Sequence, residues 1–164
     1  MAVYETVTAF RLSWPREAAM EFNKAIDTIN DIMYEGAVLF EYNFHPVVRN
    51  IIDKIAELGV PPGVEFVREY EGYFYYKDDS GMFSPSMTAD LMQAVATAYG
   101  ISTPTIVTYA ETCTKHRVGA FSGGGFVVAQ NFLEEINATE FLNKIVADFK
   151  AKPSERDELS YPMR

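Results

Sequence analysis

The stretch from Glu111 to Ala129, "ETCTKHRVGAFSGGGFVVA", gathers the residue types that could do chemistry. It holds the only cysteine of the chain, Cys113, and one of its two histidines, His116. A thiol three residues from an imidazole has the composition of a nucleophile with its base. Cys113, His116 and Glu111 are therefore the candidate catalytic residues. The alternative is that the lone cysteine is a small buried apolar side chain, as such residues usually are.

A metal site has few ligands to draw on in this sequence. One cysteine and two histidines would need carboxylates such as Glu111, and a contribution from His45, to complete a zinc site. The sequence contains neither a Cys-x-x-Cys nor a His-Glu-x-x-His motif. We therefore expect no metal centre and no cofactor, and we favour a binding protein over an enzyme, which stays the alternative.

The same stretch also contains the best candidate site for a small anion. Its residues are Lys115, His116, Arg117, Ser122, Gly123 and Gly124. Cationic side chains bind phosphate or carboxylate groups, and glycine backbone N–H groups can assist them. The glycines lack the spacing of nucleotide-binding loops and lead into an apolar strand, so no helix dipole would face the ligand. For the glycines, the alternatives are a turn or bulge with positive φ, or backbone packed closely against a neighbour. For the basic triplet, the alternative is pairing with nearby acids.

Acidic residues form a second feature, on the first predicted helix. Asp27, Asp31 and Glu35 lie at i, i+4 and i+8 and therefore share one helix face. Like charges at this spacing oppose one another by ~0.2–0.5 kcal/mol per pair, a cost that a basic partner would offset. The stripe is therefore a candidate surface for a basic protein, and an ordinary solvated face is the alternative.

The segment 69–79, "EYEGYFYYKDD", interleaves tyrosines with acids. A period of two places Tyr73 and Tyr75 on one face of a strand and the neighbouring aromatic residues on the other, one of which is the core. Exposed tyrosine among charges is typical of protein interfaces, whereas cross-strand aromatic pairing is the structural alternative. The partner-binding candidates are Asp27, Asp31, Glu35, Glu69, Glu71, Tyr73 and Tyr75.

The charge of the chain limits the partners that it can have. Its 164 residues carry a formal charge of −9, of which residues 1–79, with 14 acids and 7 bases, contribute −7. Such a surface repels phosphate backbones, so we expect no direct binding of nucleic acid. No apolar run reaches the ~20 residues that a membrane span needs, and no secretory signal is recognisable. With a single cysteine, these features predict a cytoplasmic protein.

Hydrophobic periodicity predicts the elements that must position these residues. Apolar residues at steps of three and four predict helices, and alternating or β-branched runs predict strands. Helices are expected at 15–34, 45–59, 84–100 and 137–152. Strands are expected at 2–12, 37–44, 103–113 and 124–131, and within 64–83, where turns fall near Glu71-Gly72 and at 79–81. The strands at 103–113 and 124–131 are expected to pair as a hairpin.

The resulting order, β-α-β-α-β-β-α-β-β-α, predicts the fold. From the second strand onward it contains the ferredoxin-like order, which predicts an α+β two-layer sandwich with helices on one face of a mainly antiparallel sheet. We expect one domain over residues 1–152 and a loosely ordered tail over 153–164, which begins with proline and has no apolar stripe.

These features favour a small acidic module that binds another protein. It could inhibit or regulate a basic, nucleic-acid-binding protein by offering acid in place of phosphate, as small proteins of phages and mobile elements do. The alternative is an anionic-ligand-binding protein or enzyme with a pocket around residues 111–125. A homodimer through an open sheet edge, with the tyrosine hairpin at the seam, is a third hypothesis.

Overall fold

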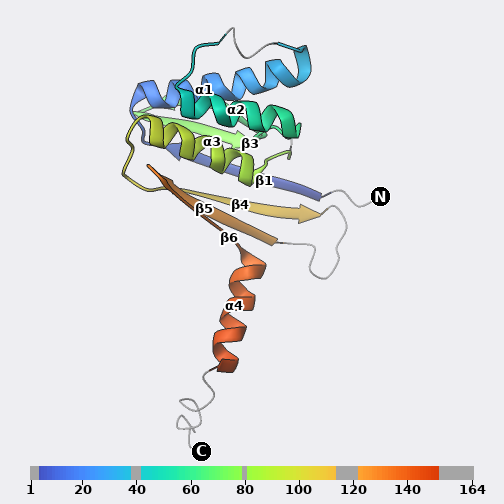
Figure 1. Ribbon diagram of the computed structural model, residues 1–164. Helices are drawn as coiled ribbons and strands as arrows, with labels where there is room; N and C mark the ends of the chain where they lie inside the picture. Colours follow the sequence, from blue (N-terminus) through green and yellow to red (C-terminus); the bar gives the residue numbers. More distant parts are fainter. Residues whose placement is uncertain (1–3, 38–41, 79–80, 114–121, 152–164) are drawn as a thin grey trace, which may run out of the picture.

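The computed structural model describes residues 4–37, 42–78, 81–113 and 122–151. These residues form an α+β fold in which six strands make one antiparallel sheet in the order β2-β3-β1-β4-β5-β6. The strands are β1 (Tyr4–Leu12), β2 (Val64–Tyr70), β3 (Tyr73–Asp78), β4 (Thr105–Cys113), β5 (Ser122–Ala129) and β6 (Phe132–Asn137). The helices are α1 (Arg16–Asn30), the π-helical turn η1 (Asp31–Glu35), α2 (Pro46–Leu58), α3 (Pro85–Ala98) and α4 (Ala138–Ala151). Helices α1 to α3 cover one face of the sheet, and α4 extends away from it (Figure 1).

The predicted helices are confirmed, and their ends follow the expected signals. Gly36 and Gly59, with φ of 72° and 67°, end η1 and α2 in the left-handed conformation that glycine adopts without strain. His45 begins α2, its Nδ1 accepting a hydrogen bond from the Val47 N–H. Asn137 caps α4, its Oδ1 accepting a 2.8 Å hydrogen bond from the Glu140 N–H.

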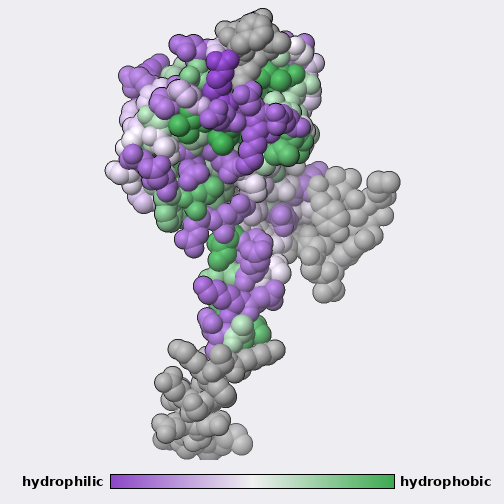
Figure 2. All heavy atoms as spheres, in the orientation of Figure 1, coloured by the Kyte–Doolittle hydropathy of each residue, from purple (hydrophilic) through white to green (hydrophobic). Residues whose placement is uncertain are grey.

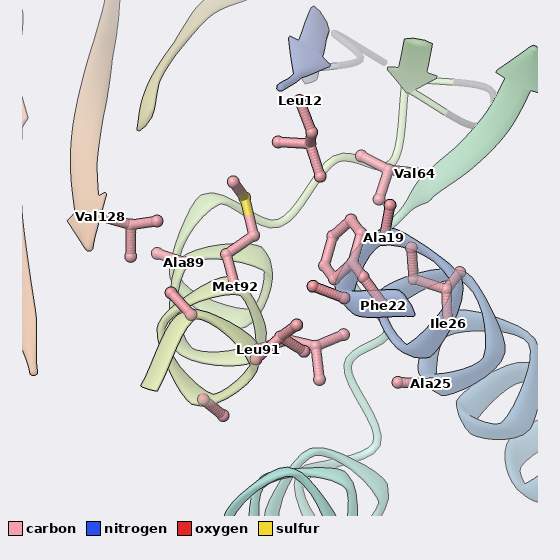
Figure 3. Packing of buried hydrophobic residues seen from close by; sticks show 14 of the residues in the cluster. Leu12, Ala19, Phe22, Ala25, Ile26, Val64, Ala89, Leu91, Met92 and Val128 are labelled. Atoms are coloured by element: carbon pink, nitrogen blue, oxygen red, sulfur yellow. The ribbon is translucent and has the colours of Figure 1, made fainter. Parts of the chain in front are cut away.

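The core lies between the sheet and the three covering helices. Phe22 of α1 is fully buried and forms edge contacts with the rings of Trp14 and Tyr76. Figure 3 shows side chains from α1, α3 and the sheet, among them Phe22, Met92 and Leu12, pointing into the same interior. The alternation predicted for the tyrosine hairpin is confirmed, since Tyr76 is buried in the core whereas Tyr73 and Tyr75 lie on the opposite face.

The strand expected at 37–44 is not observed among the described residues. Residues 38–41 lie outside the described part, and Ala37 and Tyr42 to Phe44 belong to no strand. Phe44 is nevertheless buried in the core, and Lys24 of α1 donates a hydrogen bond to the Asn43 carbonyl. Phe44 is therefore buried beside helix α1 without belonging to a strand.

The ferredoxin-like order is accordingly not confirmed. The order in the described part of the chain is β-α-π-α-β-β-α-β-β-β-α, with three helical segments, α1, η1 and α2, in succession after β1. A strand that was not predicted, β6, follows β5 through a turn at Asn131, whose φ is 54°. The expected tail, 153–164, lies outside the described residues.

Candidate protein-interaction surfaces

The predicted catalytic and anion-binding residues are only partly described. Lys115, His116 and Arg117 lie outside the described residues, and the side chain of Cys113 is not described. Glu111 lies on β4, half-buried, opposite Thr6 of β1 and Ser122 of β5. Neither a catalytic nor an anion-binding arrangement of these residues is therefore tested, and both stay predictions.

The glycine run is part of the sheet, with none of its residues in the positive-φ conformation of a turn. Gly124 lies between Tyr109 of β4 and Asn137 of β6, so its backbone has ladder partners on both sides. A Cβ atom on Gly124 would stand 2.5 Å from the Ile136 carbonyl oxygen and 2.6 Å from the Tyr109 hydroxyl. Of the two structural alternatives, close packing of backbone is the one observed, and the turn or bulge with positive φ is not.

Carboxylates surround the described part of the predicted anion site. Burial and the charges of Glu135, Glu111 and Glu140 raise the pKa of the Tyr109 phenol, whose ring lies over Gly124. Each of these carboxylates would repel a phosphate or carboxylate ligand. These carboxylates oppose an anion at Gly124 itself, and the alternative stays a prediction because Lys115, His116 and Arg117 lie outside the described residues. Among the described residues, no group of three His, Cys, Asp or Glu side chains could hold a metal ion.

The acidic stripe of α1 is present as a close pair. Burial and the charge of Asp31 raise the pKa of Asp27, so the two carboxylates are close enough to repel. Asp31 accepts a 3.1 Å hydrogen bond from the Tyr42 hydroxyl. Glu35 follows in the π-helical turn, which departs from the 3.6-residue period of an α-helix. No ion pair joins a cation of the described residues to Asp27 or Asp31.

Beside Asp27 the surface is hollowed into a groove of about 530 Å³ between α1 and the edge strand β2. We call this the α1–β2 groove; it is lined by Met20, Asn23, Ile26, Asp27, Asn30, Val64, Glu65 and Phe66. The side chains of Met20 and Phe66 are 49% and 43% exposed, which is high for large apolar residues. The Asn23 amide oxygen accepts a hydrogen bond from the buried Tyr76 hydroxyl, which anchors the groove to the core. The groove thus combines apolar walls with the carboxylates of Asp27 and Glu65, and the Glu65 carboxylate is paired with Lys77 at 2.7 Å.

The edge of β2 is shaped against simple strand pairing. The register of β2 against β3 shifts between Phe66 and Arg68, so that Val67 is an extra, bulged residue. A bulge twists an edge strand and interrupts its row of unpaired backbone groups. A partner segment would therefore be held by side-chain contacts in the α1–β2 groove more than by addition of a strand.

The remaining partner-binding candidates lie in other places. Glu69 lies on the face of the sheet that the helices cover, where its carboxylate pairs with Arg16 of α1 at 2.6 Å. Arg16 lies one helical turn before Met20. Glu71 is exposed in the β2–β3 turn with φ of 50°. Tyr73 and Tyr75 lie on the opposite face of the sheet. There the guanidinium group of Arg11 lies 4.3 Å from the Tyr73 ring centre, and that of Arg68 lies 5.5 Å from the Tyr75 ring centre.

The tyrosines therefore do not share a surface with the acidic stripe. Their cation–π contacts hold both rings against arginines of neighbouring strands. This agrees with the structural alternative, in which the aromatic residues stabilise the hairpin, and it leaves an interface role untested.

Replacing Asp27 by asparagine is expected to stabilise the fold at pH 7. Because the pKa of Asp27 is raised above its ordinary value of 3.8, ionisation of this group opposes folding. The unfavourable contribution is absent at pH values below 3.8, grows as the pH rises through the raised pKa, and is constant above it. Urea unfolding at pH 7 should show a gain of about 0.2–0.5 kcal/mol, the size of a like-charge helix pair.

The gain should disappear at pH 3, where Asp27 is protonated in both states. Asp148→Asn, the same change at an exposed position of α4, is the matched control. It should alter the free energy of unfolding at neither pH. An equal gain for Asp27→Asn at both pH values would contradict the electrostatic cause.

Sequence reasoning missed the apolar residues of the α1–β2 groove, because exposure of Met20 and Phe66 depends on how α1 lies over β2.

None of the described helices is long and apolar enough to cross a membrane. Comparison of the chain with protein-family models, with curated proteins and with solved structures found no match in any of the three.

Proposed function

We propose that this chain is a non-enzymatic module that binds a basic segment of another protein in the α1–β2 groove. The observation that carries the proposal is the combination of exposed apolar walls with the Asp27 carboxylate in one groove, with Asp31 four residues further along the same helical segment and close enough to raise the pKa of Asp27. Apolar anchors in a groove supply most of the affinity of a typical interface, and charges around it supply selection and rapid association.

The charge argument defines the partner. A lysine or arginine beside Asp27 would lower the pKa of that carboxyl group and relieve its repulsion by Asp31, so binding removes an unfavourable interaction. The net charge of −9 attracts cationic proteins over distances up to about a Debye length, ~8 Å at physiological salt. We therefore expect a partner segment with several basic residues and at least one large apolar side chain.

Nucleic-acid-binding proteins present such segments, because they neutralise phosphates with lysine and arginine. Inhibition or regulation of such a protein, by occupying its basic surface, is the finer form of the proposal. Action in the cytoplasm and an origin in a phage or mobile element belong to this finer form as well. The anionic-ligand alternative has the weaker support, since carboxylates surround the described part of its site.

The test is binding of a pool of 15-residue peptides that are rich in lysine, arginine and large apolar residues, followed by fluorescence anisotropy. The wild-type chain should bind members of this pool and should not bind a pool in which glutamate replaces the basic residues. The double variant Asp27→Lys, Asp31→Lys should lose binding by at least about 30-fold, the effect of losing a strong interface contact.

The control is the double variant Asp53→Lys, Glu57→Lys on α2. It changes the net charge by the same amount, at the same i, i+4 spacing, on an exposed helix face. It should lower affinity only slightly, through the weaker long-range field. Equal losses in the two double variants would reduce the interaction to net charge alone and would overturn a site in the α1–β2 groove. Retention of binding by Asp27→Lys, Asp31→Lys would overturn it as well.

A further inference from the structure

Helix α4 has an apolar face that none of the described residues cover. Phe141, Leu142, Ile145 and Val146 are all exposed, Leu142 by 59%, and they lie on one side of the helix because they recur at steps of one, three and one. We call these four residues the α4 apolar face. Figure 2 shows the helix as a narrow column that stands out from the body and carries both hydrophobic and hydrophilic residues.

A helix of this length needs a packing partner. Isolated helices shorter than ~12–15 residues are marginal in water, and most helical stability in proteins comes from burial of an apolar face. Helix α4 has 14 residues, and every described side chain along it is exposed. Its cap at Asn137 fixes the direction in which it leaves β6, and that direction is away from its own sheet (Figure 1).

The chain also has an apolar groove on the face of the sheet opposite α1, α2 and α3. Its volume is about 540 Å³, and it crosses β4, β5 and β6. We call this the β4–β6 groove; it is lined by Ile106, Thr108, Gly124, Gly125, Phe126, Val127, Phe132, Glu134 and Ile136. The side chain of Ile106 is 67% exposed, and Phe132 and Ile136 are exposed as well.

The sheet register explains how the groove forms. Ile106, Val127 and Glu134 make one cross-strand row, and Thr108, Gly125 and Ile136 make the next. Because Gly125 has no side chain, the middle of the second row is bare backbone with larger residues on either side. The glycine run thus opens a hollow between walls formed by β4 and β6, which suits a rod-shaped apolar partner.

The two surfaces match in size. The α4 apolar face spans about 8 Å of helix, from Phe141 to Val146, at ~1.5 Å per residue. The groove crosses three strands, a width of about 10 Å at ~4.8 Å per strand.

We propose that α4 of one copy docks in the β4–β6 groove of a second copy, and that the exchange is reciprocal. Seven exposed apolar side chains per copy would be covered: Ile106, Phe132, Ile136, Phe141, Leu142, Ile145 and Val146. At ~100 Å² for each half-exposed side chain, the two contacts bury on the order of 1,400 Å², within the ~1,200–2,000 Å² of stable specific interfaces. The two-fold arrangement closes on itself, so it gives a dimer and no larger assembly.

Other occupants have less support from the same residues. A membrane surface would favour a helix with excess lysine and arginine on its polar face. Among the described side chains of α4, Lys144 is accompanied by Glu140 and Asp148, so that excess is missing. The proposal does not depend on binding in the α1–β2 groove, which lies at the other end of the sheet.

The experiment is sedimentation velocity on the full chain and on two single variants, Leu142→Lys in α4 and Ile106→Lys in the groove. The wild type should sediment as a dimer of the 18.5 kDa chain. Because each dimer contains both contacts, either variant should raise the dissociation constant by about 100-fold or more. Lysine lowers the net negative charge, so a loss of association cannot be assigned to added repulsion between acidic chains.

Mixing the two variants gives the decisive readout. In a mixed dimer, the intact helix of the Ile106→Lys chain meets the intact groove of the Leu142→Lys chain, so one complete contact is restored. An equimolar mixture should therefore associate more strongly than either variant alone. Ala147→Lys on the opposite side of α4, and Ala110→Lys outside the groove on β4, are the matched controls and should dimerise as the wild type does.

Three results would overturn the proposal. The first is a wild-type chain that stays monomeric at about 100 μM, well above the dissociation constants of ordinary specific interfaces. The second is dissociation by Leu142→Lys with no effect of Ile106→Lys, which would indicate pairing of α4 with α4. The third is loss of association in both variants without recovery on mixing. Circular dichroism melts of each variant establish that the altered, exposed positions leave the fold intact.

Discussion

Replacing Gly63 by alanine is expected to cost the protein about 3 kcal/mol or more of unfolding free energy. Gly63 has φ of 69°, and a Cβ atom there would stand 2.0 Å from the Met82 carbonyl oxygen. The surrounding chain is fixed, because the Pro62 carbonyl accepts hydrogen bonds from the Ser84 N–H at 2.9 Å and from the Thr88 hydroxyl at 3.1 Å. The left-handed conformation alone costs about 1–2 kcal/mol, and overpacking against fixed backbone adds about 1–3 kcal/mol.

Gly59 provides a matched control for this prediction. Its φ of 67° is nearly the same, but a Cβ atom there would have no neighbour within 4 Å. Gly59→Ala should therefore lose only the conformational part, about 1–2 kcal/mol. In thermal melts, Gly63→Ala should unfold at a temperature at least ~5 °C below that of Gly59→Ala. Equal losses in the two variants would mean that the connection at 82–84 moves aside at little cost.

Gly124→Ala is expected to destabilise the β4–β6 half of the sheet by about 2 kcal/mol. The added methyl group would meet the Ile136 carbonyl oxygen at 2.5 Å and the Tyr109 hydroxyl at 2.6 Å, from the two neighbouring strands. Moving the Tyr109 ring would disturb its contact with Phe83, and moving Ile136 would separate β6 from β5. Overpacking of this kind typically costs about 1–3 kcal/mol.

The measurement for Gly124→Ala is urea unfolding together with amide hydrogen exchange. Exchange should accelerate in β5 and β6 more than in α1 or β3, because strain in an edge region lowers local stability first. Ser122→Ala, two residues earlier on the same strand, removes atoms and should have little effect. A Gly124→Ala chain as stable as the wild type would contradict a close-packing role for the glycine run.

The two proposed surfaces would act together in a dimer. The α1–β2 groove and the β4–β6 groove lie at opposite ends of the strand order, so docking of α4 leaves the first groove free on each copy. A dimer would then present two basic-segment sites. A partner with repeated basic segments would be bound with an avidity greater than that of either site alone.

Much of the local structure could be predicted from the sequence because local physics fixes it. The helices followed from apolar residues at helical spacing, and their ends from Gly36, Gly59 and the Asn137–Glu140 cap. The hairpin of β2 and β3 turns at Glu71-Gly72, both with positive φ, and β4 pairs with β5 as expected. Each of these features depends on residues close together in the chain.

Contacts between distant residues decided the features that could not be predicted. The run at 37–44 has the composition of a strand, but its described part lies against α1 instead of joining the sheet. The strand β6 was missed because its pairing with β5, and not its own acidic sequence, makes it a strand. The glycine run resembled a loop, and its meaning depends on the Tyr109 ring and the Ile136 carbonyl that approach it.

The sequence by itself therefore determined the type and extent of most elements and the acidic character of the chain. The tertiary structure alone decided which side chains share a surface. It placed Asp27 beside Met20 and Phe66 in one groove. It placed Tyr73 and Tyr75 on the opposite face of the sheet from that groove. It also left the α4 apolar face and the β4–β6 groove without a cover among the described residues. The physical reason is that burial and register depend on packing between segments far apart in the chain, which periodicity within one segment does not encode.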